Sequence, residues 1–184
     1  QQMSQSQRLV QPWMLTGMMR GLEAVCRFVL RQLIRTLAGA LASGDHALAS
    51  SSHTRGESMR IGFVGLGAMG KPMAINLAAA GHDLVVCDVE PSPVAVLAQR
   101  GAEVVSNARE VADEADVVLA CMPNLKAAEA VAIDPDGASA GTRATAFVNL
   151  GTTGSQYSER IAALMAEAGK AFLDAPISGG PPGA

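Results

Sequence analysis

Residues 60–88 read "RIGFVGLGAMGKPMAINLAAAGHDLVVCD", and this stretch decides the fold. An apolar run predicts a strand over 60–64, a glycine-rich turn follows, and apolar residues at helical spacing predict a helix over 68–80. A second strand is expected over 84–88. Gly65, Gly67 and Gly70 form a GxGxxG pattern between the first strand and the helix, which is typical of a dinucleotide-binding βαβ unit.

Each glycine of the turn has its own steric reason. Gly65 permits the tight turn, Gly67 lets the backbone approach a pyrophosphate, and Gly70 lets the helix pack closely on the strand. Free N–H groups at the helix start, with the positive end of the helix dipole behind them, favour the phosphates. The predicted cofactor-binding segment is therefore Gly65, Leu66, Gly67, Ala68, Met69 and Gly70; the alternative is a glycine turn that binds nothing.

An acidic residue ends the second strand. Asp88 lies 18 residues past Gly70, close to the separation expected for the acid that accepts the ribose hydroxyls of a dinucleotide. Its carboxylate would repel a 2′-phosphate, and Glu90 adds a second negative charge. The sequence therefore predicts NAD as the cofactor over NADP, with an ordinary turn residue before Pro91 as the other interpretation of Asp88.

The rest of residues 59–184 alternates short apolar runs with Ala-rich helical stretches. Further strands are expected over 102–105, 116–121, 145–150 and 171–175, and further helices over 91–100, 107–114, 124–132 and 155–168. Nearly continuous Val, Leu and Ala in the strands favours burial on both faces. The predicted fold is α/β, a Rossmann-type doubly wound parallel sheet.

Residues 1–58 differ in character from residues 59–184. Apolar residues between Leu15 and Leu41 recur at helical spacing with arginines opposite them, which predicts a basic amphipathic helix. We interpret this N-terminal extension either as a leader resembling a mitochondrial transit peptide or as upstream read-through before Met59. A helix needs roughly 18 consecutive apolar residues to span a bilayer, and arginines interrupt every apolar run before it reaches that length. No stable membrane insertion is therefore expected.

Charge and cysteine content exclude several classes of protein. The net charge of −3 does not favour binding to the negatively charged backbone of nucleic acid. Cys26, Cys87 and Cys121 form no CxxC pair, which indicates reduced packing residues in an intracellular protein, and no Cys/His spacing suggests a metal. The expected location is the cytoplasm, or the mitochondrial matrix if residues 1–58 are a transit peptide.

The run "FVGLGAMGKPMAINL" over 63–77 resembles the N-terminal signature of the β-hydroxyacid dehydrogenase family, which includes 3-hydroxyisobutyrate dehydrogenase and tartronate semialdehyde reductase and is related to 6-phosphogluconate dehydrogenase. The resemblance covers Met59 to Ala184. It implies hydride transfer between NAD and a short β-hydroxy acid of the 3-hydroxyisobutyrate or 2-hydroxy-3-oxopropionate type. It also implies that the loop "CMPN", with Met122, Pro123 and Asn124, passes the cofactor's ribose, and that Thr152 lies near the nicotinamide.

The final residues, "DAPISGGPPGA", resemble the family's substrate motif. In it, Ser178, Gly179 and Gly180 would grip the carboxylate of a small substrate, because a hydroxyl and bare backbone N–H groups form a concave nest. The alternative is a flexible glycine tail.

The chain also departs from the family pattern. "NLGTTGS" over 149–155 stands where the family has an Asp-Met-Ser-Thr-Ile-x-Pro type of sequence, so Gly151 replaces a serine and Ser155 a proline. The family's acid–base lysine belongs to a C-terminal all-helical domain and lies beyond Ala184. We therefore expect no catalytic residue in this chain, no turnover by the chain alone, and a homo-oligomer for the full-length protein.

Two other functions stay open. One is a non-catalytic NAD(P)-binding module or pseudoenzyme, suggested by Gly151 and the missing lysine. The other is an NADP-dependent enzyme resembling 6-phosphogluconate dehydrogenase or an imine reductase, against which Asp88 argues.

Overall fold

The fold is that of a computed structural model, which describes residues 59–177. The predicted basic helix within 1–58 and the predicted substrate residues Ser178, Gly179 and Gly180 lie outside the described residues. The described strands are β1 (Ile61–Val64), β2 (Leu84–Cys87), β3 (Glu103–Val104), β4 (Val117–Ala120), β5 (Ala146–Asn149) and β6 (Ala171–Asp174). The helices are α2 (Gly70–Ala79), α3 (Pro91–Ala98), α4 (Ala108–Glu114), α5 (Leu125–Ile133) and α6 (Ser155–Glu167), with a short 3₁₀ turn η2 (Ala138–Ala140).

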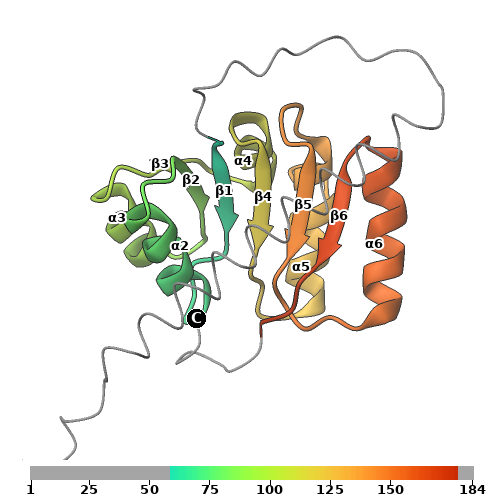
Figure 1. Cartoon of the computed structure of the whole chain (residues 1–184). Helices are drawn as coiled ribbons and strands as arrows, with labels where there is room; N and C mark the ends of the chain where they lie inside the picture. Colours follow the sequence, from blue (N-terminus) through green and yellow to red (C-terminus); the bar gives the residue numbers. More distant parts are fainter. Residues whose placement is uncertain (1–58, 178–184) are drawn as a thin grey trace, which may run out of the picture. The chain divides into compact units, whose positions relative to one another are not determined.

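The strands form one parallel sheet in the order β3-β2-β1-β4-β5-β6 (Figure 1). The chain builds outward from β1 to β3, then crosses back to place β4 on the other side of β1 and builds outward again to β6. This confirms the predicted doubly wound α/β fold. It also puts the point where the strand order reverses between β1 and β4, where open α/β sheets bind their ligands.

The predicted elements are confirmed with small differences at their ends. The first helix begins at Gly70 instead of 68, because Ala68 and Met69 complete the glycine turn. β3 is only two residues long and both are exposed, as befits an edge strand. The 3₁₀ turn η2 was not predicted, since a single turn of three residues carries no periodic signal.

Neighbouring residues of β1 face opposite layers of helices. A Cβ at Gly62 would lie 2.3 Å from Cγ1 of Val111 on α4, whereas Phe63 faces Gly70 at the start of α2. All four residues of β1 are buried as a result. The nearly continuous apolar strands of the sequence are therefore covered on both faces, as expected for parallel strands.

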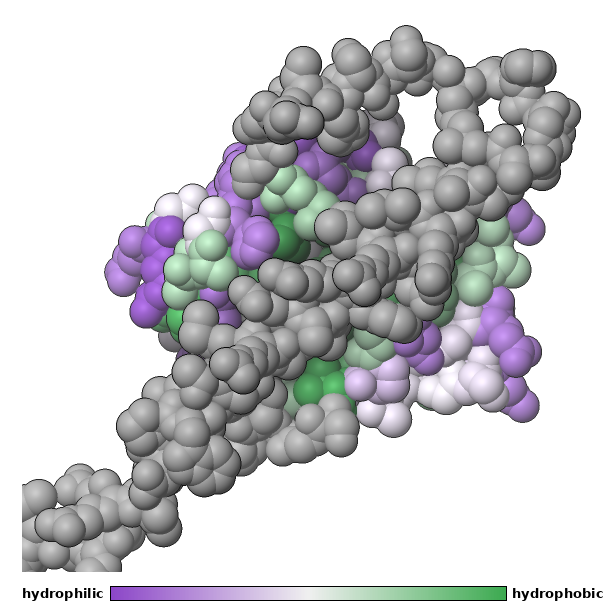
Figure 2. Space-filling view, in the orientation of Figure 1, coloured by the Kyte–Doolittle hydropathy of each residue, from purple (hydrophilic) through white to green (hydrophobic). Residues whose placement is uncertain are grey.

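The larger core lies on the face that carries α4, α5 and α6. On α6, Tyr157, Ile161 and Met165 recur every four residues and are all buried. Figure 2 shows hydrophilic residues on the outer flank of the region where α6 lies. This helix is thus amphipathic and seals the side of the sheet formed by β5 and β6.

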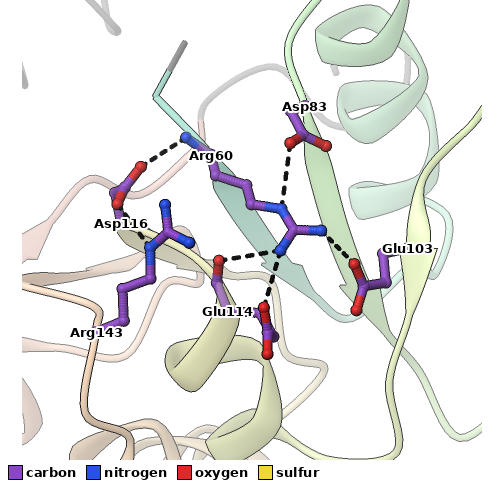
Figure 3. Close-up of polar contacts among 6 residues, drawn as sticks. All are labelled: Arg60, Asp83, Glu103, Glu114, Asp116 and Arg143. Atoms are coloured by element: carbon purple, nitrogen blue, oxygen red, sulfur yellow. Dashed lines mark hydrogen bonds and ion pairs between the residues drawn. The ribbon is translucent and has the colours of Figure 1, made fainter. Parts of the chain in front are cut away.

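A polar cluster joins elements at the amino edge of the sheet (Figure 3). Arg60 precedes β1, and its backbone N–H donates to Asp116, 2.7 Å away, just before β4. Its side chain is 17% exposed, and the guanidinium group pairs with Asp83 before β2 (3.2 Å), Glu103 of β3, and Glu114 of α4 (3.0 Å). One arginine therefore ties four elements together at the edge opposite the glycine turn.

Lys170 at the start of β6 has a buried role that the sequence did not reveal. Its Nζ donates to the carbonyl oxygens of Gly141 and Ala144, both 2.7 Å away, and burial lowers its pKa. From the sequence alone, Lys170 follows Gly169 at the end of a predicted helix, where a cation would complement the helix dipole. In the structure it satisfies two carbonyls of the loop that leads into β5.

We expect Lys170→Met to lower the free energy of unfolding by about 1–3 kcal/mol, because it leaves two carbonyls without their donor. Urea denaturation measures this. Lys126→Met is the matched control, since Lys126 is exposed on α5 and its replacement should change stability by no more than about 0.5 kcal/mol. Equal stabilities of the two variants would contradict this role of Lys170.

Candidate functional site

The residues expected to bind the cofactor gather at the carboxyl edge of the sheet. Parallel strands all end at the same edge, so the loops that follow them adjoin. These loops contain Gly65 after β1, Asp88 after β2, Met122 after β4 and Thr152 after β5. The structure thus brings together residues that lie far apart in the sequence.

The glycine turn packs across the point where the strand order reverses. Gly65 has φ 90°, and a Cβ on it would lie 2.4 Å from the carbonyl oxygen of Cys121 and 2.2 Å from Cε of Met122. A Cβ at Gly70 would lie 1.8 Å from the carbonyl oxygen of Gly65. The predicted steric roles of Gly65 and Gly70 are confirmed by these contacts.

Gly67 differs from its two neighbours in the motif. It is exposed, and a Cβ there would meet no heavy atom within 4 Å among the residues that the structure describes. Packing within residues 59–177 therefore does not require a glycine at position 67. The open space over this residue fits the close approach of a diphosphate.

The start of α2 carries no competing negative charge. Met69 is its N-cap, no side chain among residues 59–177 accepts a hydrogen bond there, and its first turn has no acidic residue. Helices usually fill this position with a Ser, Thr, Asp or Asn cap. The uncapped positive end of the α2 dipole favours an anion at this place.

Asp88 lies directly against the glycine turn. Its Oδ2 accepts a hydrogen bond from the backbone N–H of Leu66, and its Oδ1 accepts one from Glu90 N, 2.8 Å away. A carboxylate has about four acceptor sites, so two more hydrogen bonds remain possible. Its side chain is half-buried and therefore still accessible to a bound ribose.

The loops after β4 and β5 lie beside each other. The carbonyl oxygen of Met122 would be 3.5 Å from a Cβ at Gly151, an ordinary contact, and Thr152 next to it is exposed. Pro123 and Asn124 are also exposed. The Asn124 side chain accepts a hydrogen bond from Ala127 N, 2.9 Å away, which caps α5. Asn124 therefore also serves as the N-cap of α5.

Asn149 is a member of this edge that the sequence analysis missed. It ends β5 and is 1% exposed. The two N–H groups of its Nδ2 are shared among three acceptors: Asp174 Oδ1 (2.9 Å), Thr153 Oγ1 (2.8 Å) and the carbonyl oxygen of Gly151 (3.0 Å). Its Oδ1 accepts from Gly151 N, 3.2 Å away. A polar residue at the end of the apolar run "ATAFVNL" was the available signal.

Both described cysteines are unpaired packing residues. Burial raises the pKa of Cys87, with a further contribution from the Asp88 carboxylate, and burial raises the pKa of Cys121. The raised pKa values favour the protonated thiols near neutral pH. Within residues 59–177 no group of His, Cys, Asp or Glu has the geometry of a metal site, and no helix combines the length and apolar character that crossing a membrane requires.

Comparison with protein families agrees with this geometry. The family model described as the NAD binding domain of 6-phosphogluconate dehydrogenase matches residues 60–184. The chain belongs to this family. Its homologues include 3-hydroxyisobutyrate dehydrogenases and 2-hydroxy-3-oxopropionate reductase, so residues 60–184 are the NAD(P)-binding domain of a β-hydroxyacid dehydrogenase family member.

Three curated relatives show the extent of this similarity. The chain is 37% identical over 129 residues to 2-(hydroxymethyl)glutarate dehydrogenase of Eubacterium barkeri, covering 70% of the chain and 43% of that protein. It is 38% identical over 127 residues to 2-hydroxy-3-oxopropionate reductase of Escherichia coli, covering 68% and 43%. It is 36% identical over 140 residues to mitochondrial 3-hydroxyisobutyrate dehydrogenase of Drosophila melanogaster, covering 76% and 43%.

A solved structure shows the same relationship. Mycobacterium tuberculosis 3-hydroxyisobutyrate dehydrogenase with L-serine matches with a TM-score of 0.60 and 36% identity, over 68% of this chain and 42% of that one. The chain therefore spans less than half the length of the relatives it matches, and its similarity is to their cofactor domains.

Proposed function

We propose that this chain supplies the NAD-binding domain of an oxidoreductase that transfers a hydride between NAD and a short β-hydroxy acid. The substrate is of the 3-hydroxyisobutyrate or 2-hydroxy-3-oxopropionate type, as the names of the relatives suggest. When bound, the nicotinamide would supply the hydride chemistry. The residues of this chain bind and orient the cofactor and hold the substrate carboxylate.

The observation that carries the proposal is the contact between the glycine turn and Asp88. Gly67 leaves room for the diphosphate beside the uncapped start of α2, and the Asp88 carboxylate lies next to it with free acceptor sites. A carboxylate suits the ribose hydroxyls of NAD and repels the 2′-phosphate of NADP. A relative that is 40% identical over 126 residues is named an NAD-dependent L-serine dehydrogenase, from Pseudomonas aeruginosa.

The substrate end of the site lies beside β5 and β6. Thr152 follows β5, and the segment after β6 leads directly to Ser178, Gly179 and Gly180. We propose that these three residues hold the substrate carboxylate while Thr152 contacts the nicotinamide. The loop of Met122, Pro123 and Asn124 runs past the ribose of the cofactor, between the diphosphate end and the nicotinamide end of the site.

Lys170 does not supply the acid–base step. Its ammonium is held by the carbonyls of Gly141 and Ala144 at the amino edge of the sheet, away from the proposed site. A general acid or base must reach the substrate hydroxyl within hydrogen-bond distance. We assign this role to the lysine that the family resemblance places beyond Ala184.

Calorimetric titration of the 184-residue chain with NAD and NADH tests cofactor binding. We expect both dinucleotides to bind and Gly67→Ala to raise their Kd at least tenfold, because a methyl group occupies the space of the diphosphate. The unfolding temperature of the free variant should match the wild type, since no described atom is near. The absence of binding heat for both dinucleotides to the wild-type chain would overturn the proposal.

A second candidate is an NADP-dependent reductase that acts on imines. An imine reductase from a Pseudomonas species matches with a TM-score of 0.59 and 27% identity, over 68% of this chain and 43% of that one. Tighter binding of NADPH than of NADH would favour it.

Homo-oligomer formation and a location in the cytoplasm or mitochondrial matrix remain predictions.

A further inference from the structure

The buried amide of Asn149 joins two segments at the carboxyl edge. One segment, residues 151–153, follows β5: it accepts two hydrogen bonds from Nδ2 of Asn149 and donates one to its Oδ1. The other begins at Asp174, the last residue of β6, whose Oδ1 accepts from Nδ2 of Asn149 at 2.9 Å. The amide therefore bridges two loops that belong to different strands.

The backbone continues this bridge beyond both strands. Ala175 N donates to the carbonyl oxygen of Asn149, 2.8 Å away, and Ile177 N donates to that of Leu150, 3.2 Å away. Ser158 of α6 fixes the other oxygen of Asp174 at 2.6 Å. The two segments thus run together up to the residue before Ser178.

We propose that Asn149 is a positioning residue that sets the separation between the Thr152 loop and the segment leading to Ser178. This rests on the proposed function, in which Thr152 contacts the nicotinamide and Ser178 the substrate carboxylate. The amide would then hold the Thr152 loop against residues 175–177 without touching cofactor or substrate. Its burial and its several partners leave it no other orientation that satisfies them.

An amide suits this place because it both donates and accepts without carrying charge. The family motif begins with aspartate at the position of Asn149. An ionised aspartate there would face the Asp174 carboxylate, and like charges this close raise the pKa of one of the pair. Arg160 on α6 lies in the same region, since it and Asp174 both act on Tyr157, but it is paired with Glu129 on α5 (2.5 Å). This ion pair has no net charge that could offset the repulsion between the two carboxylates.

Hydrogen exchange measured by mass spectrometry on the 184-residue chain tests this role without any ligand. We expect Asn149→Ala to speed exchange at least tenfold in residues 150–154 and 175–177. Lys170→Met is the matched control: it weakens the other end of the same strands, so any rise that it causes in these two segments reports global unfolding and should be smaller than the rise in Asn149→Ala. Unchanged exchange in Asn149→Ala, or an equal increase in Lys170→Met, would overturn the proposal.

Asn149→Asp separates a positioning role from simple packing and serves also if Asn149→Ala fails to fold. We expect burial and the neighbouring Asp174 carboxylate to favour the protonated form of this aspartate, whose single O–H can still donate to Asp174 at low pH. Exchange corrected for the intrinsic rate should be within threefold of wild type at pH 5 and at least tenfold faster at pH 8. A loss that does not depend on pH would overturn the donor role of the amide.

The outcome is independent of the test of the proposed function. If the wild-type chain binds no dinucleotide, the proposed function fails while the exchange data still decide whether Asn149 joins the two segments. If it binds, the Kd for NADH of Asn149→Ala should rise at least threefold, while that of Lys170→Met stays at the wild-type value.

Discussion

Replacing Gly70 with alanine will lower the free energy of unfolding of this domain by about 3 kcal/mol or more, at the upper end of what overpacking causes. The added Cβ would lie 1.8 Å from the carbonyl oxygen of Gly65, 2.9 Å from its carbonyl carbon and 3.0 Å from Cε1 of Phe63. The Gly65 backbone has little room to yield, because it is itself packed against Cys121 and Met122. Helix α2 must therefore move away from β1.

Urea denaturation of the wild type, Gly70→Ala and Gly67→Ala measures this effect. Gly67→Ala is the matched control, three residues away in the same motif, with open space around its Cβ and no positive φ to relieve. We expect it to stay within about 0.5 kcal/mol of the wild type. If the two variants were equally stable, the close packing of α2 on β1 would not be what this glycine provides.

The glycine turn shows how far sequence reasoning reaches. The pattern around Gly65 and Gly70 predicts a turn and close helix packing, and both follow from local geometry. The partner of Gly65 could not be predicted in the same way. Met122 comes from a loop more than fifty residues later, and only the strand order places it there.

The strands were predictable for a similar local reason. Runs such as the one ending at Val64 are nearly all apolar, and burial on both faces of a parallel sheet requires that. The buried roles of Asn149 and Lys170 were not predictable, because the Asp174 carboxylate that ties Asn149 to β6 and the two carbonyls that Lys170 binds lie 25 to 29 residues away in sequence. A polar residue beside an apolar run looks the same whether it is solvated or buried with partners.

The two edges of the sheet carry different kinds of polar residue. At the amino edge, Arg60 and Lys170 bind acidic groups and carbonyls within the domain. At the carboxyl edge, Asp88 keeps acceptor sites free and Gly67 leaves open space. Substitutions of Arg60 and Lys170 should therefore change stability, whereas substitutions of Asp88 and Gly67 should change binding.

Replacing Asp88 with alanine is expected to weaken NADH binding at least about 100-fold and NADPH binding much less, so that the preference for NADH disappears. Each hydrogen bond to a charged group contributes about 1.5–3 kcal/mol, and the carboxylate has sites for two ribose hydroxyls. Alanine also leaves the N–H of Leu66 without its acceptor, which loosens the glycine turn for both cofactors. Only NADH loses the ribose contacts, while NADPH gains relief from charge repulsion.

Asp88→Asn separates the charge from the hydrogen bond to the turn. Its amide oxygen can still accept from Leu66 N while the negative charge is gone. We expect NADH binding to weaken by roughly tenfold and NADPH binding to strengthen relative to the wild type, both measured by calorimetric titration. Wild-type affinity for NADPH equal to or tighter than that for NADH would show that the carboxylate at the end of β2 does not select the cofactor.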